Sequence, residues 1–268
     1  MAAGKRWTRE ELLVAMNVYG KLPFGQFDQR NPVVKDVARM LERSPGSLAM
    51  KLSNLASLDP AHRARSIKGL KKTSTLDKEI WAEFHENQEH LAAISEELFR
   101  QLCSATDSDD VELIKGVGVR LERKRYPTPP IGPTEKSTSV LARRGQQFFR
   151  QMILNAFDGR CCVTGIGVRD LLIASHIKPW GAFPESRLDI QNGLCLSRLH
   201  DAAFDRGLIS FDENCRLVLS RELKEHLPQA AIEQNFVAFE GVGIQVPEDA
   251  LGPNMEFLSF HRKVVFRR

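Results

Sequence analysis

The stretch LLIASHIKPWGAFPESRLDIQNGLCLSRLHDAAFDRG, residues 171–207, decides the fold of the C-terminal half of the chain. It begins with an apolar run, Leu171–Ile177, and contains a second one at Gly193–Ser197. Short apolar runs bounded by turn-forming residues predict strands, and the helical spacing of apolar residues in Leu199–Arg206 predicts a helix. We therefore expect an antiparallel strand pair followed by a helix, which is a ββα unit.

Three polar residues of this unit, His176, Asn192 and His200, are separated by intervals of 16 and 8 residues. If the two strands pair and lead into the helix, the three side chains converge on one ion. Taken singly, each residue also has an ordinary structural interpretation: a core histidine satisfied by a carbonyl, a turn-forming asparagine and a surface histidine. Their expected convergence makes them candidates for one functional site.

The flanking segments predict a mixed α and β domain over residues 140–268. Val140–Ala156 has the apolar spacing and the positive charges of a basic amphipathic helix. Cys161–Thr164 is expected to form a further strand. LISFDENCRLVLS at 208–220 is expected to form a hairpin with its turn at Asp212–Asn214.

The N-terminal residues 1–106 predict a helical domain, because apolar residues recur there at helical spacing. Ser44 separates two such patterns and can cap the second helix, with Pro45 at its first position. The outline is that of a helix-turn-helix, in which Lys51 and Asn54 of the second helix face outward toward DNA. Two packed helices without a ligand share this pattern, so both interpretations stay open.

Residues 107–139 are expected to form a linker. The segment YPTPPIGPTEKSTS at 126–139 holds four of the chain's 13 prolines, which restrict their own backbone and disfavour helix in the preceding residue. The expected fold class is thus α+β, with a helical, helix-turn-helix-like N-terminal domain joined to a C-terminal domain built around the ββα unit.

The composition is typical of a soluble globular protein, with 42% hydrophobic and 27% charged residues among 268. No apolar run approaches the roughly 18 residues that span a bilayer, and no secretory signal is visible at the N-terminus. Five cysteines without a C-x-x-C pair argue against a disulfide framework. We therefore expect a cytoplasmic protein without membrane contact. Residues 1–80 carry 15 basic and 8 acidic side chains, which suits a polyanion partner or an ordinary solvated surface.

Four motifs follow one another between residues 143 and 268: RRGQQFFRQMILNAFDGRCCVTG, ASHIKPW, NGLCLSRLHDAAFDRGLIS and FLSFHRKVVF. In this order they resemble the HNH nucleases with a ββα-metal fold, in the branch of bacterial restriction endonucleases. An ordered chain of motifs is far more specific than the three letters H, N and H alone. His261 of the last motif is expected to be structural or to face phosphate.

The resemblance implies hydrolysis of DNA phosphodiester bonds with a divalent metal ion, in a bacterial restriction or defence enzyme. His176 would be the general base, because an imidazole with a pKa of about 6.5 is largely neutral at pH 7 and can accept a proton. Asn192 would orient that imidazole or bind the metal, and His200 would be a metal ligand on the helix. The cation would neutralise charge that develops on the phosphate.

One residue departs from the family pattern. Many HNH nucleases have a metal-binding Asp or His immediately before the base, and this chain has Ser175. Asp201 and Asp205 are candidates to supply the missing carboxylate, with Asp205 preferred because it lies in the FD-x-G motif, although it could instead cap the helix. A site with few protein ligands suits Mg²⁺, while Mn²⁺, Ni²⁺ or Zn²⁺ could substitute.

Double-stranded DNA is the expected partner. Lys178, Arg143 and Arg144 are candidates to contact its phosphates, with ordinary surface charge as the alternative interpretation. Cleavage of both strands with one site per chain would favour a homodimer. The alternative function is a DNA-binding regulator whose HNH-like scaffold has lost catalysis, which the serine at position 175 would favour.

Overall fold

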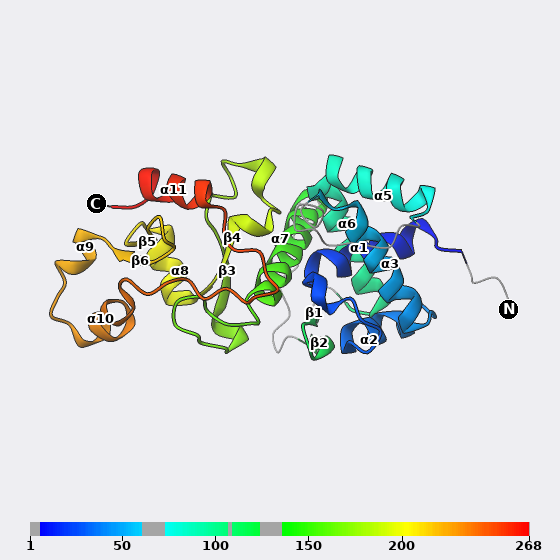
Figure 1. The fold of residues 1–268 in the computed structure, drawn as a ribbon, viewed down its shortest axis with the longest axis horizontal. Helices are drawn as coiled ribbons and strands as arrows, with labels where there is room; N and C mark the ends of the chain where they lie inside the picture. The colour runs from blue at the N-terminus through cyan, green and yellow to red at the C-terminus, as the bar shows by residue number, and fades with distance from the viewer. Residues whose placement is uncertain (1–5, 61–72, 107–108, 124–135, 268) are drawn as a thin grey trace. The chain divides into compact units, whose positions relative to one another are not determined.

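The computed structural model describes residues 6–60, 73–106, 109–123 and 136–267, and the chain divides into two compact units, Met1–Met152 and Ile153–Arg268 (Figure 1). The boundary lies inside a helix, whereas the sequence placed it in the preceding proline-containing segment. Among the helices that the structure describes, none combines the length and the apolar character needed to cross a membrane.

The first unit is mainly helical, as predicted, and also contains one hairpin. Its elements are α1 (Arg9–Lys21), the 3₁₀ turn η1 (Phe24–Gln26), α2 (Pro32–Met40), α3 (Pro45–Leu58), α5 (Thr75–Glu86), α6 (Gln88–Leu102), β1 (Asp109–Ile114), β2 (Gly118–Arg123) and most of α7 (Lys136–Ala156). Helices α2 and α3 meet at a short turn. Ser44 caps α3 by accepting a hydrogen bond from the backbone of Ser47, with Pro45 at the first helical position, as predicted.

Lys51 and Asn54 do not face outward from α3, which corrects the expectation that they contact DNA. The Lys51 ammonium lies 2.6 Å from a carboxylate oxygen of Asp77 on α5, and both side chains are buried. Asn54 is also buried. Leu48, Leu52 and Leu55 define only one packed face in the sequence, but α3 packs against α1, α2 and α5, so its other face is covered as well.

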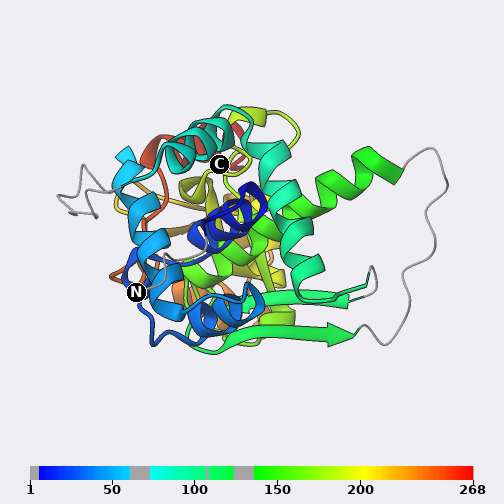
Figure 2. The same ribbon diagram turned by 90° about the vertical axis from the view of Figure 1, so that its right-hand side faces the viewer.

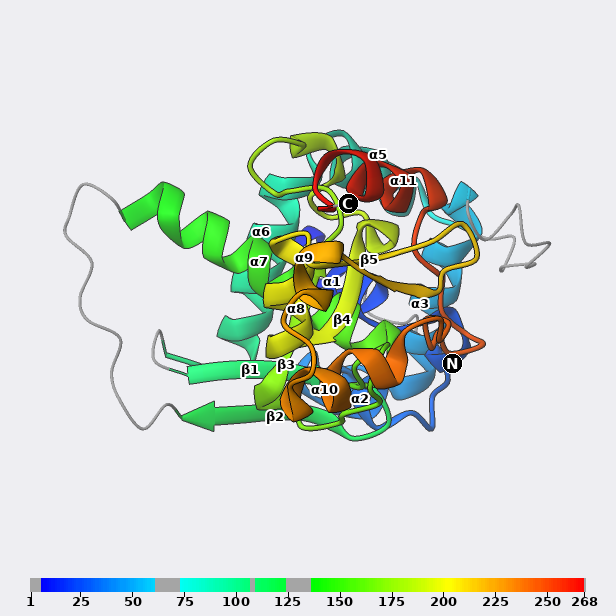
Figure 3. The ribbon, with the colours of Figure 1, turned by 90° about the vertical axis from the view of Figure 1, so that its left-hand side faces the viewer.

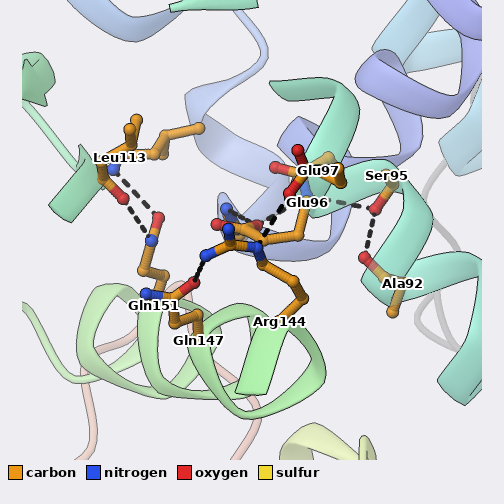
Figure 4. Close-up of polar contacts among 11 residues, drawn as sticks. Ala92, Ser95, Glu96, Glu97, Leu113, Arg144, Gln147 and Gln151 are labelled. Atoms are coloured by element: carbon orange, nitrogen blue, oxygen red, sulfur yellow. Dashed lines mark hydrogen bonds and ion pairs between the residues drawn. The ribbon is translucent and has the colours of Figure 1, made fainter. Parts of the chain in front are cut away.

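Strands β1 and β2 form an antiparallel hairpin within the segment that the sequence predicted as a linker (Figure 2). Gln151 of α7 covers the open edge of β1: its amide oxygen accepts from the Leu113 N–H at 3.0 Å, and its amide nitrogen donates to the Val111 carbonyl at 2.7 Å (Figure 4). The rest of the predicted linker, 124–135, lies outside the described residues, and α7 begins at Lys136.

Arg144 on α7 is buried, which corrects its expected role in DNA contact. Its Nε donates to a Glu97 carboxylate oxygen on α6 at 2.9 Å, and its guanidinium also donates to Gln147 (Figure 4). The ion pair between Arg144 and Glu97 therefore connects α7 to α6 within the first unit. Its neighbour Arg143 is exposed and stays a candidate for phosphate contact.

The second unit contains the predicted ββα arrangement (Figure 3). Strand β3 (Leu172–His176) pairs antiparallel with β4 (Gly193–Ser197), so that His176 lies opposite Gly193. The next elements are α8 (Arg198–Asp205), β5 (Ile209–Phe211), β6 (Leu217–Leu219), α9 (Arg221–Lys224), α10 (Ala230–Asn235) and α11 (Met255–Val264). The unit also has 3₁₀ turns η2 (Arg169–Leu171), η3 (Pro184–Ser186), η4 (Ile190–Asn192) and η5 (Val237–Phe239).

The predicted hairpin at 208–220 is confirmed by β5 and β6, which pair antiparallel. The strand predicted at Cys161–Thr164 is wrong, because this segment forms a turn instead. The Gly165 N–H donates to the Cys161 carbonyl at 2.8 Å, and Gly165 has a positive φ of 73°. A left-handed glycine reverses the chain here, which a run of β-favouring residues does not reveal.

The glycine of the FD-x-G motif, Gly207, follows the end of α8 and lies against Val265 and Phe266. Its φ is +70°, and a Cβ built on it would lie 2.1 Å from the carbonyl oxygen of Val265. The Gly207 carbonyl also accepts from the Arg267 N–H at 2.9 Å. The motif therefore needs glycine for two reasons, its left-handed backbone and the close approach of another segment.

Gly207→Ala is expected to lower the free energy of unfolding by at least about 2 kcal/mol, since the strained backbone and the overpacking each cost about 1 kcal/mol or more. Gly241→Ala is the matched control: Gly241 also has a positive φ, of +77°, but nothing lies within 4 Å of its added Cβ. Urea unfolding of both variants measures the difference. Equal losses in the two variants would show that the contact with Val265 does not matter.

Candidate active site

A pocket of about 400 Å³ in the second unit brings two histidines, two aspartates and a serine together. The lining comes from β3 and the residues after it, from α8, and from α11 and the residue that follows it. The lining residues are Ile173, Ala174, Ser175, His176, Ile177, Pro179, Trp180, Asp201, Asp205, His261 and Val265. Asn192, His200 and Lys178 are not among these lining residues, so the three residues H, N and H do not converge on this pocket.

His176 ends β3, and its ring geometry suits a general base. Its Nε2 lies 2.9 Å from the Arg187 carbonyl oxygen. Because a carbonyl can only accept, Nε2 carries the hydrogen, and the neutral ring keeps its lone pair on Nδ1. Burial lowers the pKa of His176 below its usual value of 6.5, and the hydrogen bond to the Arg187 carbonyl opposes this shift. The imidazole is therefore neutral at pH 7 and able to accept a proton.

Asn192 closes the loop between β3 and β4, and this corrects its expected role as a metal ligand. Its side-chain oxygen accepts from the Lys178 N–H at 2.8 Å, and its amide nitrogen donates to the Ser186 carbonyl at 2.9 Å. Its own backbone carbonyl accepts from the Ile177 N–H at 2.9 Å. The residue is fully buried. Its oxygen and nitrogen are therefore used within the protein, and it acts on His176 only through the loop that it holds.

His200 is buried on α8 and does not fit the expected role of metal ligand. Its Nε2 donates to the Asn235 carbonyl at 2.8 Å, so its Nδ1 holds the lone pair. That Nδ1 lies 2.9 Å from the Ser197 hydroxyl, which donates to it. Burial lowers the pKa of His200, against the effect of the Asn235 carbonyl. Both ring nitrogens thus have protein partners, and the residue connects the start of α8 to the end of α10.

Asp201 and Asp205 lie one helical turn apart on α8, and both line the pocket. Burial raises the pKa of Asp201, while the Ser175 hydroxyl and the charge of Arg198 lower it. Burial also raises the pKa of Asp205, and the charge of Asp201 raises it further. Two carboxylates that repel each other in a half-buried pocket favour a bound cation or a proton.

The Ser175 hydroxyl supports the interpretation of the pocket as a cation site. It is buried, and among the described residues it has no hydrogen-bond partner of normal geometry, although it lies close enough to Asp201 to lower the pKa of that carboxyl. A buried oxygen without such a partner beside two carboxylates gives an all-oxygen donor set, which hard cations such as Mg²⁺ prefer.

Within the described ranges there is no group of three His, Cys, Asp or Glu side chains that could hold a metal. A cation at Asp201 and Asp205 would therefore complete its shell with water and substrate oxygens, as Mg²⁺ commonly does. The sequence put Asp205 first and Asp201 second. The structure places both carboxylates in the pocket, and their spacing of four residues is the signal that could have paired them from the start.

Lys178 follows His176 by two residues, but its ammonium lies among aromatic rings. The Nζ atom is 4.4 Å from the ring centroid of Phe257 and 5.0 Å from that of Phe183. Cation–π contacts of this kind are attractive. Among the described residues, the side-chain contacts of Lys178 do not bring it into the pocket, and its expected phosphate contact stays a prediction.

His261 on α11 has the structural role that was one of its two expected interpretations. Its Nε2 donates to the Phe204 carbonyl at 3.0 Å, and its Nδ1 accepts from the Ser210 hydroxyl at 2.9 Å. The ring stacks on that of Phe204 with centroids 3.7 Å apart. Burial is the main cause that lowers the pKa of His261 to about 4, with a further contribution from the charge of Arg262.

The protein is expected to lose stability in acid through His261. The unfolded histidine has a pKa of 6.5 and binds a proton before the folded one does, so stability that is present above pH 6.5 is lost as pH falls toward 4. The loss amounts to about 3 kcal/mol. Urea unfolding across this range should show a smaller pH dependence for His261→Gln than for the wild type. His226→Gln, at an exposed histidine, is the control, and equal pH dependence in all three proteins would contradict the prediction.

Comparison with known proteins finds a match for the segment that supplies most of the pocket lining. Residues 161–212 match the family model described as HNH endonuclease. No curated protein matches the chain. The matched segment contains β3, β4, α8 and β5, and with them His176, Asp201 and Asp205. Residues 161–212, about a fifth of the chain, are therefore similar to the HNH endonuclease family.

Proposed function

We propose that the chain is a metal-dependent endonuclease that hydrolyses DNA phosphodiester bonds with His176 as the general base. One observation carries the proposal: a neutral imidazole, with its lone pair on Nδ1, lines the same pocket as two adjacent carboxylates. Hydrolysis of a phosphodiester needs a base for the attacking water and positive charge for the phosphate. The family match supports nuclease chemistry in general.

In this mechanism His176 acts as the base, and two aspartates would bind the cation. Nδ1 of His176 takes a proton from the attacking water while the water oxygen forms a bond to phosphorus. In the same step, the bond between phosphorus and the 3′ oxygen breaks. The 3′ oxygen leaves and gains a proton from solvent. Asp201 and Asp205 would hold a divalent cation, with the Ser175 hydroxyl beside them. When bound, the cation supplies positive charge against the phosphate oxygens. Ile177, Pro179 and Trp180 also line the pocket.

The proposed substrate is double-stranded DNA, and the proposed role is restriction or defence, which the motif order suggests. Mg²⁺ is the proposed ion, because the donors are oxygens. A specific observation favours the second candidate, a DNA-binding regulator without catalysis: a serine stands where many HNH nucleases have a metal ligand. The two functions differ in whether the bound DNA is cut.

Incubation of the purified protein with plasmid DNA tests the proposal. Mg²⁺ or Mn²⁺ is expected to produce nicked or linear plasmid, and a chelator should prevent cleavage. Parallel reactions with methylated, otherwise modified and unmodified DNA would show whether base modification is required. Binding of the same DNA in a gel-shift experiment, without cleavage by any of these metals, would support the regulator instead.

A further inference from the structure

The loop between β3 and β4, residues 177–192, carries the carbonyl that holds the His176 ring. Asn192 fastens the ends of this loop through its bonds to the backbone of Ile177, Lys178 and Ser186. The loop contains only the short 3₁₀ turns η3 and η4 as regular structure. The position of the Arg187 carbonyl therefore depends on side-chain contacts made within the loop.

Arg187 makes such a contact with Trp180 across the loop. Its Nε donates to the Trp180 carbonyl oxygen at 2.8 Å, and its guanidinium carbon lies 5.2 Å from the centroid of the Trp180 ring. The same tryptophan ring packs edge-to-face against the His176 imidazole, with centroids 5.2 Å apart and planes at 78°. Each of the three residues His176, Arg187 and Trp180 therefore contacts the other two.

We propose that Arg187 and Trp180 are positioning residues that fix the ring orientation and the tautomer of His176 for proton transfer. The proposal rests on the proposed function, because it assigns these residues to the same reaction. The backbone carbonyl of Arg187 accepts the hydrogen bond from Nε2 of His176. The side chain of Arg187 contacts Trp180, whose ring packs against His176. Misplacement of a catalytic group by about 1 Å can cost about a hundredfold in rate. A loop with little regular structure needs contacts of this kind to hold its position.

The replacement Arg187→Lys separates positioning from direct contact with phosphate. Lysine keeps the positive charge but cannot reproduce the planar fork of arginine, in which Nε donates while the guanidinium stacks on an aromatic ring. If Arg187 positions the base, kcat should fall by about tenfold to a hundredfold while KM changes little. A raised KM with an unchanged kcat would assign Arg187 to phosphate contact and overturn the proposal.

Arg198→Lys is the matched control in the same unit. The Nε of Arg198 also donates to a loop carbonyl, that of Asp170, at 3.1 Å, and this arginine does not contact the base. Lysine keeps the charge that lowers the pKa of Asp201. The control variant should therefore retain its kcat. An equal loss in both variants would show a general effect of losing a loop contact and would overturn the proposal.

Trp180 offers a test by conservative rescue. Trp180→Phe keeps an aromatic face and the backbone carbonyl that Arg187 uses, whereas Trp180→Ala removes the packing surface. We expect Trp180→Phe to keep most of the kcat and Trp180→Ala to lose about as much as Arg187→Lys. Equal activity of the alanine and phenylalanine variants would overturn the assignment of Trp180.

A spectroscopic experiment tests the positioning independently of cleavage. Nitrogen-15 NMR of histidine-labelled protein, without metal and at a pH well above the histidine pKa, reports which ring nitrogen carries the hydrogen. His176, assigned by comparison with His176→Gln, should show the Nε2–H tautomer in the wild type and in Trp180→Phe. A mixture of tautomers is expected in Arg187→Lys. An unchanged tautomer in Arg187→Lys would overturn the proposal, even if the wild type proved to cut no DNA.

Discussion

Replacement of His176 by alanine is expected to lower kcat for DNA cleavage by about a thousandfold, within the range that general-base catalysis contributes. The physical reason is the loss of the Nδ1 lone pair, which the hydrogen bond from Nε2 to the Arg187 carbonyl places on that nitrogen. The affinity for DNA should change little, because phosphate neutralisation dominates it. Single-turnover cleavage and a gel-shift titration measure the two quantities.

Two other histidines of the second unit serve as controls for this experiment. His226 is exposed and lies outside the pocket lining, so His226→Ala should cleave like the wild type. His200→Ala should lose thermal stability, because it removes the bonds to Ser197 and Asn235. Undiminished cleavage by His176→Ala would remove His176 as the base, and wild-type stability of His200→Ala would remove its structural role.

The sequence predicted the ββα unit because its signals are local. Apolar runs of strand length at both ends of a turn-rich loop, followed by a Ser-capped helix, specify β3, β4 and α8 with little help from distant residues. The placement of His176 at the end of β3 follows from that pattern. Asp205 lies in the pocket lining, and its role as a metal ligand stays a prediction.

The roles of Asn192 and His200 could not be predicted in the same way, because their partners are set by tertiary structure. The carbonyl that accepts from His200 belongs to Asn235, which is 35 residues away in the chain. The backbone groups that satisfy Asn192 come from a folded loop. A polar residue in a motif is equally compatible with a ligand and with a loop fastener until those partners are known.

In the first unit, the hairpin was missed although the sequence carries a signal for it. Apolar and charged residues alternate in Asp109–Ile114 and again in Gly118–Arg123, which is the pattern of paired strands. Gly116, with positive φ, lies in the turn between them, and Gly118, also with positive φ, begins β2. The nearby acidic and proline-containing stretches favoured a linker, so the short alternation was not interpreted as a pair of strands. The burial of Lys51 and Arg144 depends on carboxylates from other helices, which helical periodicity does not show.

Asp201→Asn and Asp205→Asn are each expected to weaken metal binding by more than about a hundredfold. Loss of an outer-shell partner alone costs about tenfold to a hundredfold in metal affinity, and here a charged ligand is removed. Asparagine keeps the size of the side chain and an oxygen donor, so the change isolates the negative charge. Calorimetric titration with Mn²⁺ measures the affinity, and plasmid cleavage should fall in parallel.

Thermal unfolding gives a second measurement that does not depend on cleavage. A ligand that binds only the folded chain stabilises it in proportion to the logarithm of its concentration, so Mn²⁺ should raise the Tm of the wild type. Each asparagine variant should lose most of this rise. Without metal the same variants should be as stable as the wild type or more so, because the charge of Asp201 disfavours ionisation of Asp205.

Asp170→Asn, at an exposed carboxylate outside the pocket lining, is the matched control and should keep the full metal response. If both pocket variants bind Mn²⁺ like the wild type, the cation binds elsewhere, and Asp201 and Asp205 are not its ligands.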